Sequence, residues 1–513
     1  MIEFSFTVPV GDNTPIEELA RRKLKANKID KCIILKKSID ARKKDKIVYQ
    51  YRVAVGLVNE RKYICENVKQ YNDEICSLEN MCKGLLKDMK PIVVGTGPAG
   101  LFCALTLSYF GAKPIVLERG ADALKRMQKV NKFFKELELD ENVNVQFGEG
   151  GAGTFSDGKL NTNLHNPLIK VVLNEFVKHG APEEITYLSK PHIGTDNLVE
   201  VVRRIRKTII ERGGEVHFET KLTSINIENG KFVSAVTDKG VFYGNRLYLA
   251  IGHSARDTFE MLYSKGIVME SKTFSMGARI EHKRLDIDFA QYGNQSKFLP
   301  SADYKMAVKT DTGKSLYTFC MCPGGRVINA SSETGGICVN GMSYFARNDE
   351  NSNSAVLVNV GIEDWKSEHP LAGMEYQRKY ERATFNVSGS YRPIVQLYGD
   401  LVKGKESKRI GEVKPSVETG YVLGDLRECL DVGIVDTIIS GVKAFGKKLR
   451  KFDDYNAVLT GIEARSSSPV KILRDEKYRS SVENIYPIGE GAGYAGGIMS
   501  AAIDGIKSVF ADI

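Results

Sequence analysis

Three closely spaced glycines are the residues of this chain best suited to binding the phosphates of a dinucleotide. The apolar segment 91–94 has the pattern of a short buried strand, and Gly95, Gly97 and Gly100 follow it directly. Gly95 permits a tight turn, Gly97 lets the backbone approach a pyrophosphate, and Gly100 lets the next helix pack closely on the sheet. The segment therefore predicts a strand, a phosphate-binding turn and a helix.

The helix expected after this turn begins at Pro98 and Ala99 and leads to a second strand at 114–117. Its free N–H groups and its dipole favour phosphate binding. The second strand ends in Glu118, whose carboxylate can accept hydrogen bonds from ribose hydroxyls, and Arg119 follows at the same expected site. An acid at this position favours an unphosphorylated ribose, as in FAD or NAD.

A second glycine cluster lies near the end of the chain. A strand pattern at 484–488 is followed by Gly489 and Glu490, and then Gly496, Gly497 and Ile498 open a helix. Between the two clusters, residues 213–256 have the pattern of a meander of short strands and then a buried strand. Leu222 and Gly252 of this region are expected to line the same nucleotide site.

This second cluster resembles the second nucleotide motif of the glutathione-reductase-like FAD flavoproteins. The resemblance implies that the acid binds the ribityl chain and that the helix N-terminus faces the pyrimidine ring of the flavin. Glu490 stands where that pattern more often has Asp, so its longer side chain would reach the ribityl chain through water. No second strand–GxGxxG–helix unit follows, so NAD(P)H is expected only as a transient electron donor.

A glycine-rich loop at 148–159 supplies further candidates. Its backbone N–H groups at Gly150 and Gly151 and the hydroxyls of Thr154 and Ser156 are suited to line the pyrophosphate and the flavin edge. Lys159 is the candidate for a positive charge near flavin N5 or N1, where it would stabilise the reduced anion. The alternatives are a surface Ω-loop and a solvated lysine.

Two other side chains are candidates for catalysis. His253 follows Gly252, and Arg465 precedes the last glycine cluster, where it would clamp a carboxylate or phosphate. The alternatives are a structural histidine and an ion pair between Arg465 and Glu463. His282 is a further histidine that would face a substrate.

Cys320 and Cys322 suggest redox chemistry, but a CxC pair closes a strained ring poorly, so buried free thiols are expected.

Segments along essentially the whole chain are similar to one family, the uncharacterised FAD-dependent dehydrogenases with a small N-terminal domain. The segments are SIDARKK (38–44), VVGTGPAGLF (93–102), VLERG (116–120), FGEGGAGTFSDGKLNT (147–162), ARIEH (278–282), FCMCPGG (319–325), NGMSYFARNDENSNSAV (340–356), TGIEARSSSP (460–469) and IGEGAGYAGGIMSAAIDG (488–505). The resemblance implies bound FAD and a substrate domain inserted within the FAD domain. It names no substrate.

The fold class expected is α/β, with a Rossmann-like FAD-binding domain, an inserted α+β substrate domain and a small N-terminal ferredoxin-like α/β domain. The expected boundaries are 1–90 for the N-terminal domain, 91–265 and 456–513 for the two parts of the FAD domain, and 266–455 for the inserted domain. The polar stretch after residue 56 predicts a second helix and a linker.

Composition narrows the class of protein. The chain has 513 residues, 42% of them hydrophobic, which excludes a disordered tail, a collagen-like repeat and a coiled coil. Nine cysteines are too few for a disulfide-built scaffold, and their spacing predicts no metal site. The apolar stretch 92–117 is broken by glycines and prolines, and the first residues lack a secretory signal, so we expect a soluble cytoplasmic protein without membrane contact.

The net charge of +9 lies mainly at the N-terminus, where residues 1–90 hold 19 lysines and arginines against 13 acids. The leading hypothesis is an FAD-dependent oxidoreductase that exchanges a hydride at flavin N5 with a small organic substrate. One alternative is an RNA-associated flavoprotein that docks RNA on the basic N-terminal unit, although no RNA-binding motif supports a nucleic-acid partner. Another is a flavin-holding protein without its own substrate. The sequence leaves the oligomeric state open.

Overall fold

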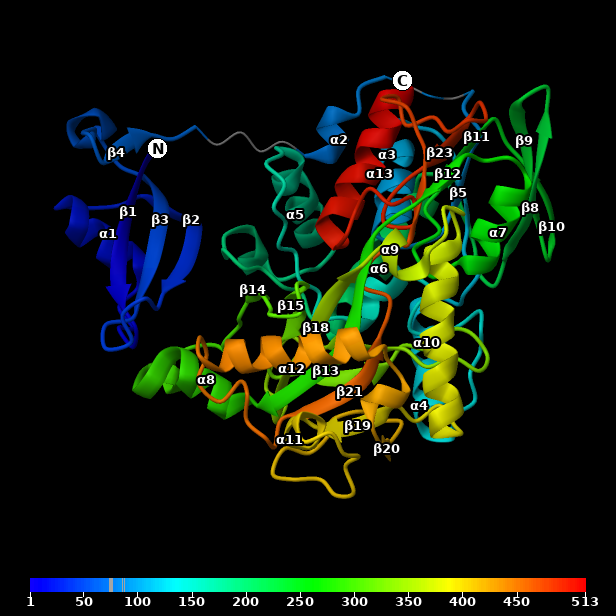
Figure 1. Ribbon diagram of the computed structural model, residues 1–513. Helices are drawn as coiled ribbons and strands as arrows, with labels where there is room; N and C mark the ends of the chain where they lie inside the picture. The colour runs from blue at the N-terminus through cyan, green and yellow to red at the C-terminus, as the bar shows by residue number, and fades with distance from the viewer. Residues whose placement is uncertain (73–76, 85, 87) are drawn as a thin grey trace.

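The computed structural model describes residues 1–72, 77–84, 86 and 88–513 as a small N-terminal unit beside a larger body (Figure 1). The N-terminal unit contains β1 (Ile2–Pro9), α1 (Ile16–Leu24), β2 (Lys31–Asp40), β3 (Val48–Gly56) and β4 (Val68–Gln70). Its antiparallel sheet has the order β2-β3-β1-β4. Alternate residues of β1, from Ile2 to Val8, face its core.

The stretch after β3 differs from the helix expected there. It contains a 3₁₀ helix, η1 (Glu60–Tyr63), the edge strand β4 and one helical turn, α2 (Leu78–Met81). Part of the expected linker lies outside the described residues. The prediction failed because polar composition does not distinguish a helix from an exposed edge strand.

A five-stranded parallel sheet forms the centre of the body, in the order β23-β11-β5-β6-β7. Its strands are β5 (Pro91–Val94), β6 (Ile115–Leu117), β7 (Glu215–His217), β11 (Arg246–Leu249) and β23 (Ile485–Pro487). Strand residues alternate between two cores, so Val93 faces one layer while Ile92 and Val94 face the other. The result is a three-layer α/β arrangement.

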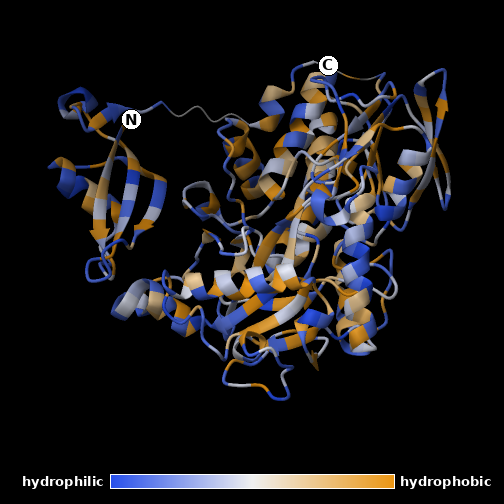
Figure 2. Cartoon of the chain, viewed as in Figure 1, coloured by the Kyte–Doolittle hydropathy of each residue, from blue (hydrophilic) through white to orange (hydrophobic). Residues whose placement is uncertain are grey.

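Helices cover one face of this sheet and a small antiparallel meander covers the other. The helical face holds α3 (Pro98–Tyr109), α5 (Leu168–Lys178), α6 (Thr195–Glu211) and α13 (Ile498–Asp512). The other face holds β8 (Leu222–Glu228), β9 (Lys231–Thr237), β10 (Gly240–Tyr243) and α7 (Arg256–Ser264). In Figure 2 the hydrophobic residues gather in the elements at the centre of the body.

A second, seven-stranded sheet follows in the order β14-β15-β18-β13-β21-β19-β20 and is antiparallel except for its last pair. Its strands are β13 (Phe274–Lys283), β14 (Ala307–Lys309), β15 (Ser315–Cys322), β18 (Asn351–Val360), β19 (Ile394–Leu397), β20 (Val422–Leu423) and β21 (Val458–Glu463). Helix α12 (Val432–Gly446) packs on it through a shared apolar core. The sheet continues beyond the boundary expected at residue 455, because β21 lies between β13 and β19.

The remaining elements connect and cover these layers. They are α4 (Ala123–Glu136), η2 (Gly151–Phe155), η3 (Glu183–Thr186), β12 (Met269–Ser271), α8 (Arg284–Tyr292), η4 (Gly293–Phe298), β16 (Arg326–Asn329), β17 (Val339–Met342), α9 (Ile362–Trp365), α10 (Ala372–Ser388), α11 (Tyr398–Val402), η5 (Leu426–Glu428) and β22 (Val470–Ile472). None of the helices in the described residues combines the length and hydrophobicity needed to cross a bilayer.

Hydrogen bonds link the N-terminal unit to the body at the 187–189 segment and at α8. The backbone N–H of Lys37 donates to the carbonyl of Tyr187 at 2.8 Å, and the N–H of Ser189 donates to the carbonyl of Lys37 at 2.9 Å. Lys44, from the basic run predicted to be a solvated or docking turn, donates to the carbonyl of Ala290 in α8 at 2.6 Å. At least part of the basic run therefore docks on the body, which lies beside the N-terminal unit in Figure 1.

Candidate functional site

The two glycine motifs meet at one edge of the parallel sheet. Parallel strands end at the same edge, so the residues after β5, β6, β11 and β23 are brought together. A Cβ atom on Gly489 would lie 2.7 Å from Cβ of Ala99, and one on Gly491 would lie 2.5 Å from the carbonyl oxygen of Gly252. Motifs nearly 400 residues apart in the sequence therefore form one site.

The first turn has the shape that its glycines predict. Gly95 has a φ of +100°, and a Cβ there would lie 2.3 Å from the carbonyl oxygen of Ala250. A Cβ on Gly100 would lie 1.9 Å from the carbonyl oxygen of Gly95. No side chain of the described residues caps α3, which begins at Pro98 after Gly97. The N–H groups of its first turn are thus available to an anion.

Glu118 ties the loops around this turn together. One carboxylate oxygen accepts hydrogen bonds from the backbone and hydroxyl of Thr96 at 2.9 and 2.6 Å, and the other accepts from the N–H groups of Gly120 and Gly148 at 2.8 and 3.1 Å. A carboxylate can accept about four hydrogen bonds, so these four donors already occupy Glu118 fully. A ribose hydroxyl would therefore have to replace one of them.

Arg119 and Leu222 lie beside the site without pointing freely into it. The Arg119 guanidinium forms a bidentate pair with Asp257 at 3.0 and 2.9 Å, and it stacks 4.1 Å from the ring centre of Phe147. Leu222 is buried in the apolar core on the meander side of the sheet. Both residues thus support the walls of the site.

The glycine-rich loop packs directly against the first motif. Gly150 donates its N–H to the carbonyl of Thr96 at 2.9 Å, and a Cβ on Gly151 would lie 3.0 Å from Cα of Gly97. Gly151 has a φ of +62°. The loop therefore packs against the turn of the first motif and is not an isolated surface loop.

Arg126 holds this loop and was missed by sequence reasoning. Its guanidinium is wholly buried and donates to five backbone carbonyls, those of Asn144, Val145, Gly148, Glu149 and Gly151. Burial lowers the pKa of Arg126 to about 10, against the opposing effect of the Glu118 and Glu149 charges. The residue lies in an ordinary helix pattern, so only its tertiary contacts reveal its role.

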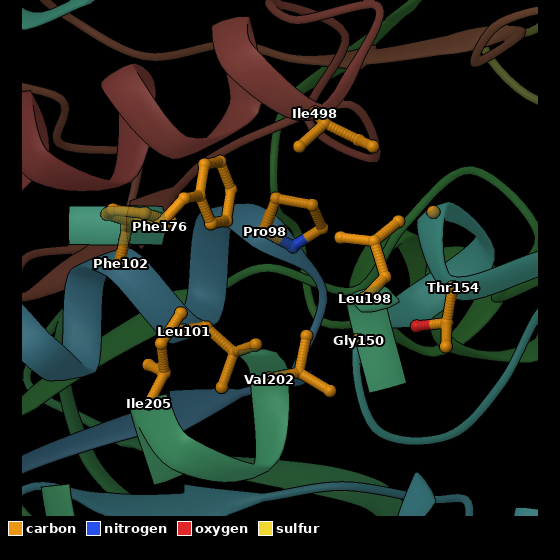
Figure 3. A pocket seen from close by; sticks show the side chains of 11 residues that line it. Pro98, Leu101, Phe102, Gly150, Thr154, Phe176, Leu198, Val202, Ile205 and Ile498 are labelled. Atoms are coloured by element: carbon orange, nitrogen blue, oxygen red, sulfur yellow. The ribbon is translucent and has the colours of Figure 1, made fainter. Parts of the chain in front are cut away.

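Thr154 and Ser156 use their hydroxyls within the loop. Thr154 donates to the carbonyl of Glu149 at 3.2 Å, and Ser156 donates to the carbonyl of Gly153 at 2.6 Å. Thr154 also lines an apolar cavity of about 20 Å³. Figure 3 shows Pro98, Thr154 and Ile498 around this cavity, so the first turns of α3 and α13 and the loop meet there.

Lys159 emerges from the end of this loop. Its backbone forms an isolated bridge with His192, whose ring stacks on Phe345 at 5.2 Å. Among the residues that the structure describes, none forms a hydrogen bond or an ion pair with its ammonium. Its charge is one cause of the lowered pKa of Cys320. Lys159 thus retains an uncompensated positive charge near that thiol.

The second motif presents an acid and an open helix end. Burial raises the pKa of Glu490 to about 7. The positive charge of Lys272 opposes this rise, and the charge of Cys320 adds to it. A Cβ on Gly496 or Gly497 would meet no described atom within 4 Å. Within the described residues, no side chain caps α13 after Gly497. The site therefore has a second helix N-terminus that faces open space.

The contacts of Arg465 differ from both roles that the sequence suggested, a clamp for a substrate anion and a partner for Glu463. Its guanidinium pairs with Glu381 of α10 at 2.7 Å through two nitrogens and donates to Ser332 at 2.5 Å, whereas Glu463 pairs with Arg279. Burial raises the pKa of Glu381, but Arg256 and Arg465 together lower it to about 2. The charge of Arg465 is therefore already paired, so it is not a free clamp for a substrate anion.

The two histidines singled out in the sequence are uncharged. Burial lowers the pKa of His253 to about 3, helped by Arg465 and Arg256, and its Nδ1 lies 2.9 Å from the hydroxyl of Ser254. His282 is buried, with Nε2 2.7 Å from the carbonyl of Phe452, and burial lowers its pKa to about 4. His282 thus packs in the core of the second sheet and does not face a substrate.

A cleft of about 510 Å³ opens on the second sheet. It is lined by Thr273, Ser275, Lys314, Tyr317, Asn359 and Ser467, among others. Its neighbour Ser468 donates to the carbonyl of Gly491 at 3.3 Å, which joins this edge to the second motif. The volume is within the range of small-molecule sites.

These features fit FAD. The cradle of Gly95, Gly97 and Gly100 suits a pyrophosphate, and two uncapped helix ends suit the pyrophosphate and an electron-rich ring edge. The glycine-rich loop adds the unpaired ammonium of Lys159, and the second motif adds the carboxyl of Glu490. The fold and the site together define a dinucleotide-binding flavoprotein.

Comparison with known proteins agrees with this class. A family model described as "FAD-dependent protein, C-terminal domain-like" matches residues 273–466, and a domain of unknown function matches residues 3–56. An uncharacterized protein of Clostridium beijerinckii is 46% identical over 506 residues, which cover 97% of this chain and 95% of that protein. The chain belongs to the same family of FAD-dependent proteins as this relative.

Solved structures show weaker likeness. L-proline dehydrogenase from P. horikoshii is 12% identical with a TM-score of 0.33, over 82% of this chain and 93% of that chain. Glycine oxidase from Bacillus cereus is 10% identical with a TM-score of 0.35, over 83% and 96% of the two chains. At these TM-scores neither likeness bears on substrate or mechanism.

Proposed function

We propose that the protein is an FAD-dependent oxidoreductase that moves a hydride between flavin N5 and a small organic substrate. The observation that carries the proposal is the meeting of two glycine motifs at one edge of a parallel sheet, each opening a helix with an uncapped first turn. Bound FAD would supply the hydride acceptor or donor.

The chain's own residues divide into three roles. The N–H groups at Gly97 and Ala99 would hold the pyrophosphate. Gly150 and Gly151, whose N–H groups already donate to the carbonyls of Thr96 and Gly148, would line it with backbone, and Glu118 and Arg126 would fix the loops around it. Gly496 and Gly497 would direct the dipole of α13 at the flavin, while Glu490 would bind the ribityl chain. Lys159 would stabilise negative charge on the reduced cofactor.

The second sheet would present the substrate. Residues 91–265 and the segment after β21 would bind the cofactor, and the seven-stranded sheet would close the site with the cleft at Ser275 and Tyr317. Lys314 in this cleft pairs with Asp364 at 2.5 Å, so the cleft contains charged groups of both signs. NAD(P)H would reach the flavin only transiently, through the same opening.

Stopped-flow reduction of the FAD-loaded protein tests this proposal. NADH or NADPH should bleach the flavin absorbance near ~450 nm, and an organic or inorganic acceptor should restore it. Lys159→Met should slow reduction by roughly tenfold or more, whereas Lys170→Met, an exposed lysine of α5, should leave it unchanged. Loaded protein that no donor reduces would instead indicate a flavin-holding role.

A further inference from the structure

Two cysteines near the end of β15 are left unused by the proposed cofactor site. The pairing of β15 with β18 shifts between Phe319 and Cys322, which marks a bulge at residues 320–321. Cys320 has a φ of +40°, a conformation that side chains other than glycine rarely adopt. Bulges and such conformations often redirect a side chain beside an active site.

Both cysteines contact one guanidinium. Arg279 donates to the carbonyl of Cys320 at 2.8 Å and lies 4.0 Å from Sγ of Cys322, while Sγ of Cys322 donates to the same carbonyl at 3.3 Å. Cys322 is completely buried, whereas Cys320 is partly exposed. Within the pair, Cys320 is thus the more exposed residue.

The charges around the pair separate the two thiols. The hydrogen bond from Cys322 lowers the pKa of Cys320 well below its ordinary value despite burial, and Arg279 and Lys159 add to the effect. The pKa of Cys322 is raised by the same hydrogen bond and by burial. By contrast, burial raises the pKa of Cys338 to about 12. A thiol with a lowered pKa beside one with a raised pKa is the arrangement of a reactive dithiol.

Electrostatic interactions link the pair to the candidate flavin site. Cys320 interacts electrostatically with Lys159 of the glycine-rich loop and with Glu490 of the second motif. The loop after β17 joins these parts, because Thr195 donates its N–H to the carbonyl of Ser343 at 3.2 Å and Arg347 pairs with Asp157 at 2.9 Å. Cys320 is therefore within electrostatic range of residues from both cofactor-binding motifs.

We propose that Cys320 and Cys322 form a redox-active pair that exchanges two electrons with FAD bound to the same chain. The ring strain that disfavours a permanent link between residues two apart would make this link easily reduced, as a reversible exchange requires. The inference rests on the proposed function, because FAD is the oxidant. The Cys320 thiolate and the Cys322 thiol form an Sγ–Sγ bond and release two electrons and one proton. Oxidised flavin takes both electrons and, at N5, the proton, and becomes the reduced anion. In reverse, reduced flavin cleaves the disulfide.

The test counts electrons in anaerobic dithionite titrations of the air-oxidised, FAD-loaded protein. Wild type should consume about four electrons per FAD, two for the flavin and two for the disulfide, whereas Cys322→Ser and Cys320→Ser should consume about two. Cys338→Ser, which removes another buried cysteine, should still consume about four. Consumption of about two by wild type would overturn the proposal.

A second readout does not depend on the cofactor. Peptide mapping of air-oxidised protein without FAD should find Cys320 linked to Cys322, with a mass about 2 Da lower than the dithiol peptide. Failure to form this link, even with an added disulfide oxidant, would also overturn the proposal. Protein that forms the link but binds no FAD would refute the proposed function and with it the electron exchange. Circular dichroism would confirm that both serine variants fold.

Discussion

At the scale of single residues, the site depends on positions where a side chain would collide with backbone. Gly95 and Gly100 have backbone atoms within 2.3 Å of where a Cβ would lie, so substitution there would distort the turn itself. Gly97 differs, because a Cβ would lie 3.9 Å from Cα of Gly151 and would fit. A larger side chain at Gly97 would therefore occupy the space of the phosphates while leaving the fold intact.

Gly97→Leu should weaken FAD binding by roughly tenfold or more, because the pyrophosphate loses its close approach to the backbone. The measurement is the FAD retained after dialysis, with circular dichroism to check folding. Gly433→Leu is the matched control, since no described atom lies within 4 Å of a Cβ there and the residue is exposed. Full FAD occupancy in Gly97→Leu would contradict the assigned phosphate position.

Glu490→Gln should change how the stability of FAD-free protein depends on pH. Because the folded-state pKa of Glu490 is raised to about 7, its neutral form stabilises the fold at low pH, and this contribution is lost as pH rises through about 7. The variant should equal wild type near about pH 4, below the ordinary pKa of 4.5, and gain about 1–2 kcal/mol near about pH 8.5, allowing for partial exposure.

Denaturant unfolding at the two pH values measures this difference. Glu476→Gln, at an exposed glutamate, should show no such gain. An equal stability change for Glu490→Gln at both pH values would show that the carboxyl is not held in a desolvated site.

At the scale of elements, the loop from residue 144 to 151 is built around one buried guanidinium. Helix α4 carries Arg126 under the loop, and its five hydrogen bonds hold the loop carbonyls toward this one side chain. The loop then presents Gly150 and Gly151 to the first motif. Its conformation thus depends on α4 and not on its own glycines alone.

Arg126→Met should lower the free energy of unfolding by about 3–5 kcal/mol and should also reduce FAD binding, because five carbonyls lose their donor. Urea denaturation and FAD titration measure the two effects. Arg203→Met, which removes an arginine paired with Glu200 on the surface of α6, should change stability by less than about 1 kcal/mol. Similar effects of the two substitutions would refute the role assigned to Arg126.

Sequence patterns predicted the elements whose evidence is local. The strand, glycine turn and helix at residues 91–109 follow from neighbouring residues, and so do the second motif and the alternation in β1. The partner of Arg465 was not predictable, because Glu381 lies on a helix more than 80 residues away. The membership of β21 in the second sheet likewise depends on pairing with distant strands.

At the scale of the whole molecule, the N-terminal unit is attached by contacts on the body as well as by the chain. Ile47 is 2% exposed and belongs to the apolar core under the second sheet, not to the core of its own unit. Lys37 and Lys44 add backbone-directed hydrogen bonds to the 187–189 segment and to α8. The basic charge of this unit therefore serves at least partly to dock it.

Ile47→Asp should detach the N-terminal unit, because a carboxylate would be buried without a partner. Small-angle X-ray scattering should show a larger radius of gyration, while FAD content stays unchanged. Val58→Asp in the same unit is the control, since Val58 is 80% exposed and should leave the scattering as in wild type. An unchanged radius of gyration in Ile47→Asp would contradict docking through this contact.

The central claim is that both glycine motifs hold one FAD, and the flavin content of the purified protein tests it most directly. The protein should be yellow with absorbance near ~450 nm, or become so on reconstitution, and denaturation should release about one FAD per chain. Chromatography of the released flavin distinguishes FAD from FMN. Colourless protein that cannot be reconstituted with FAD would contradict the account.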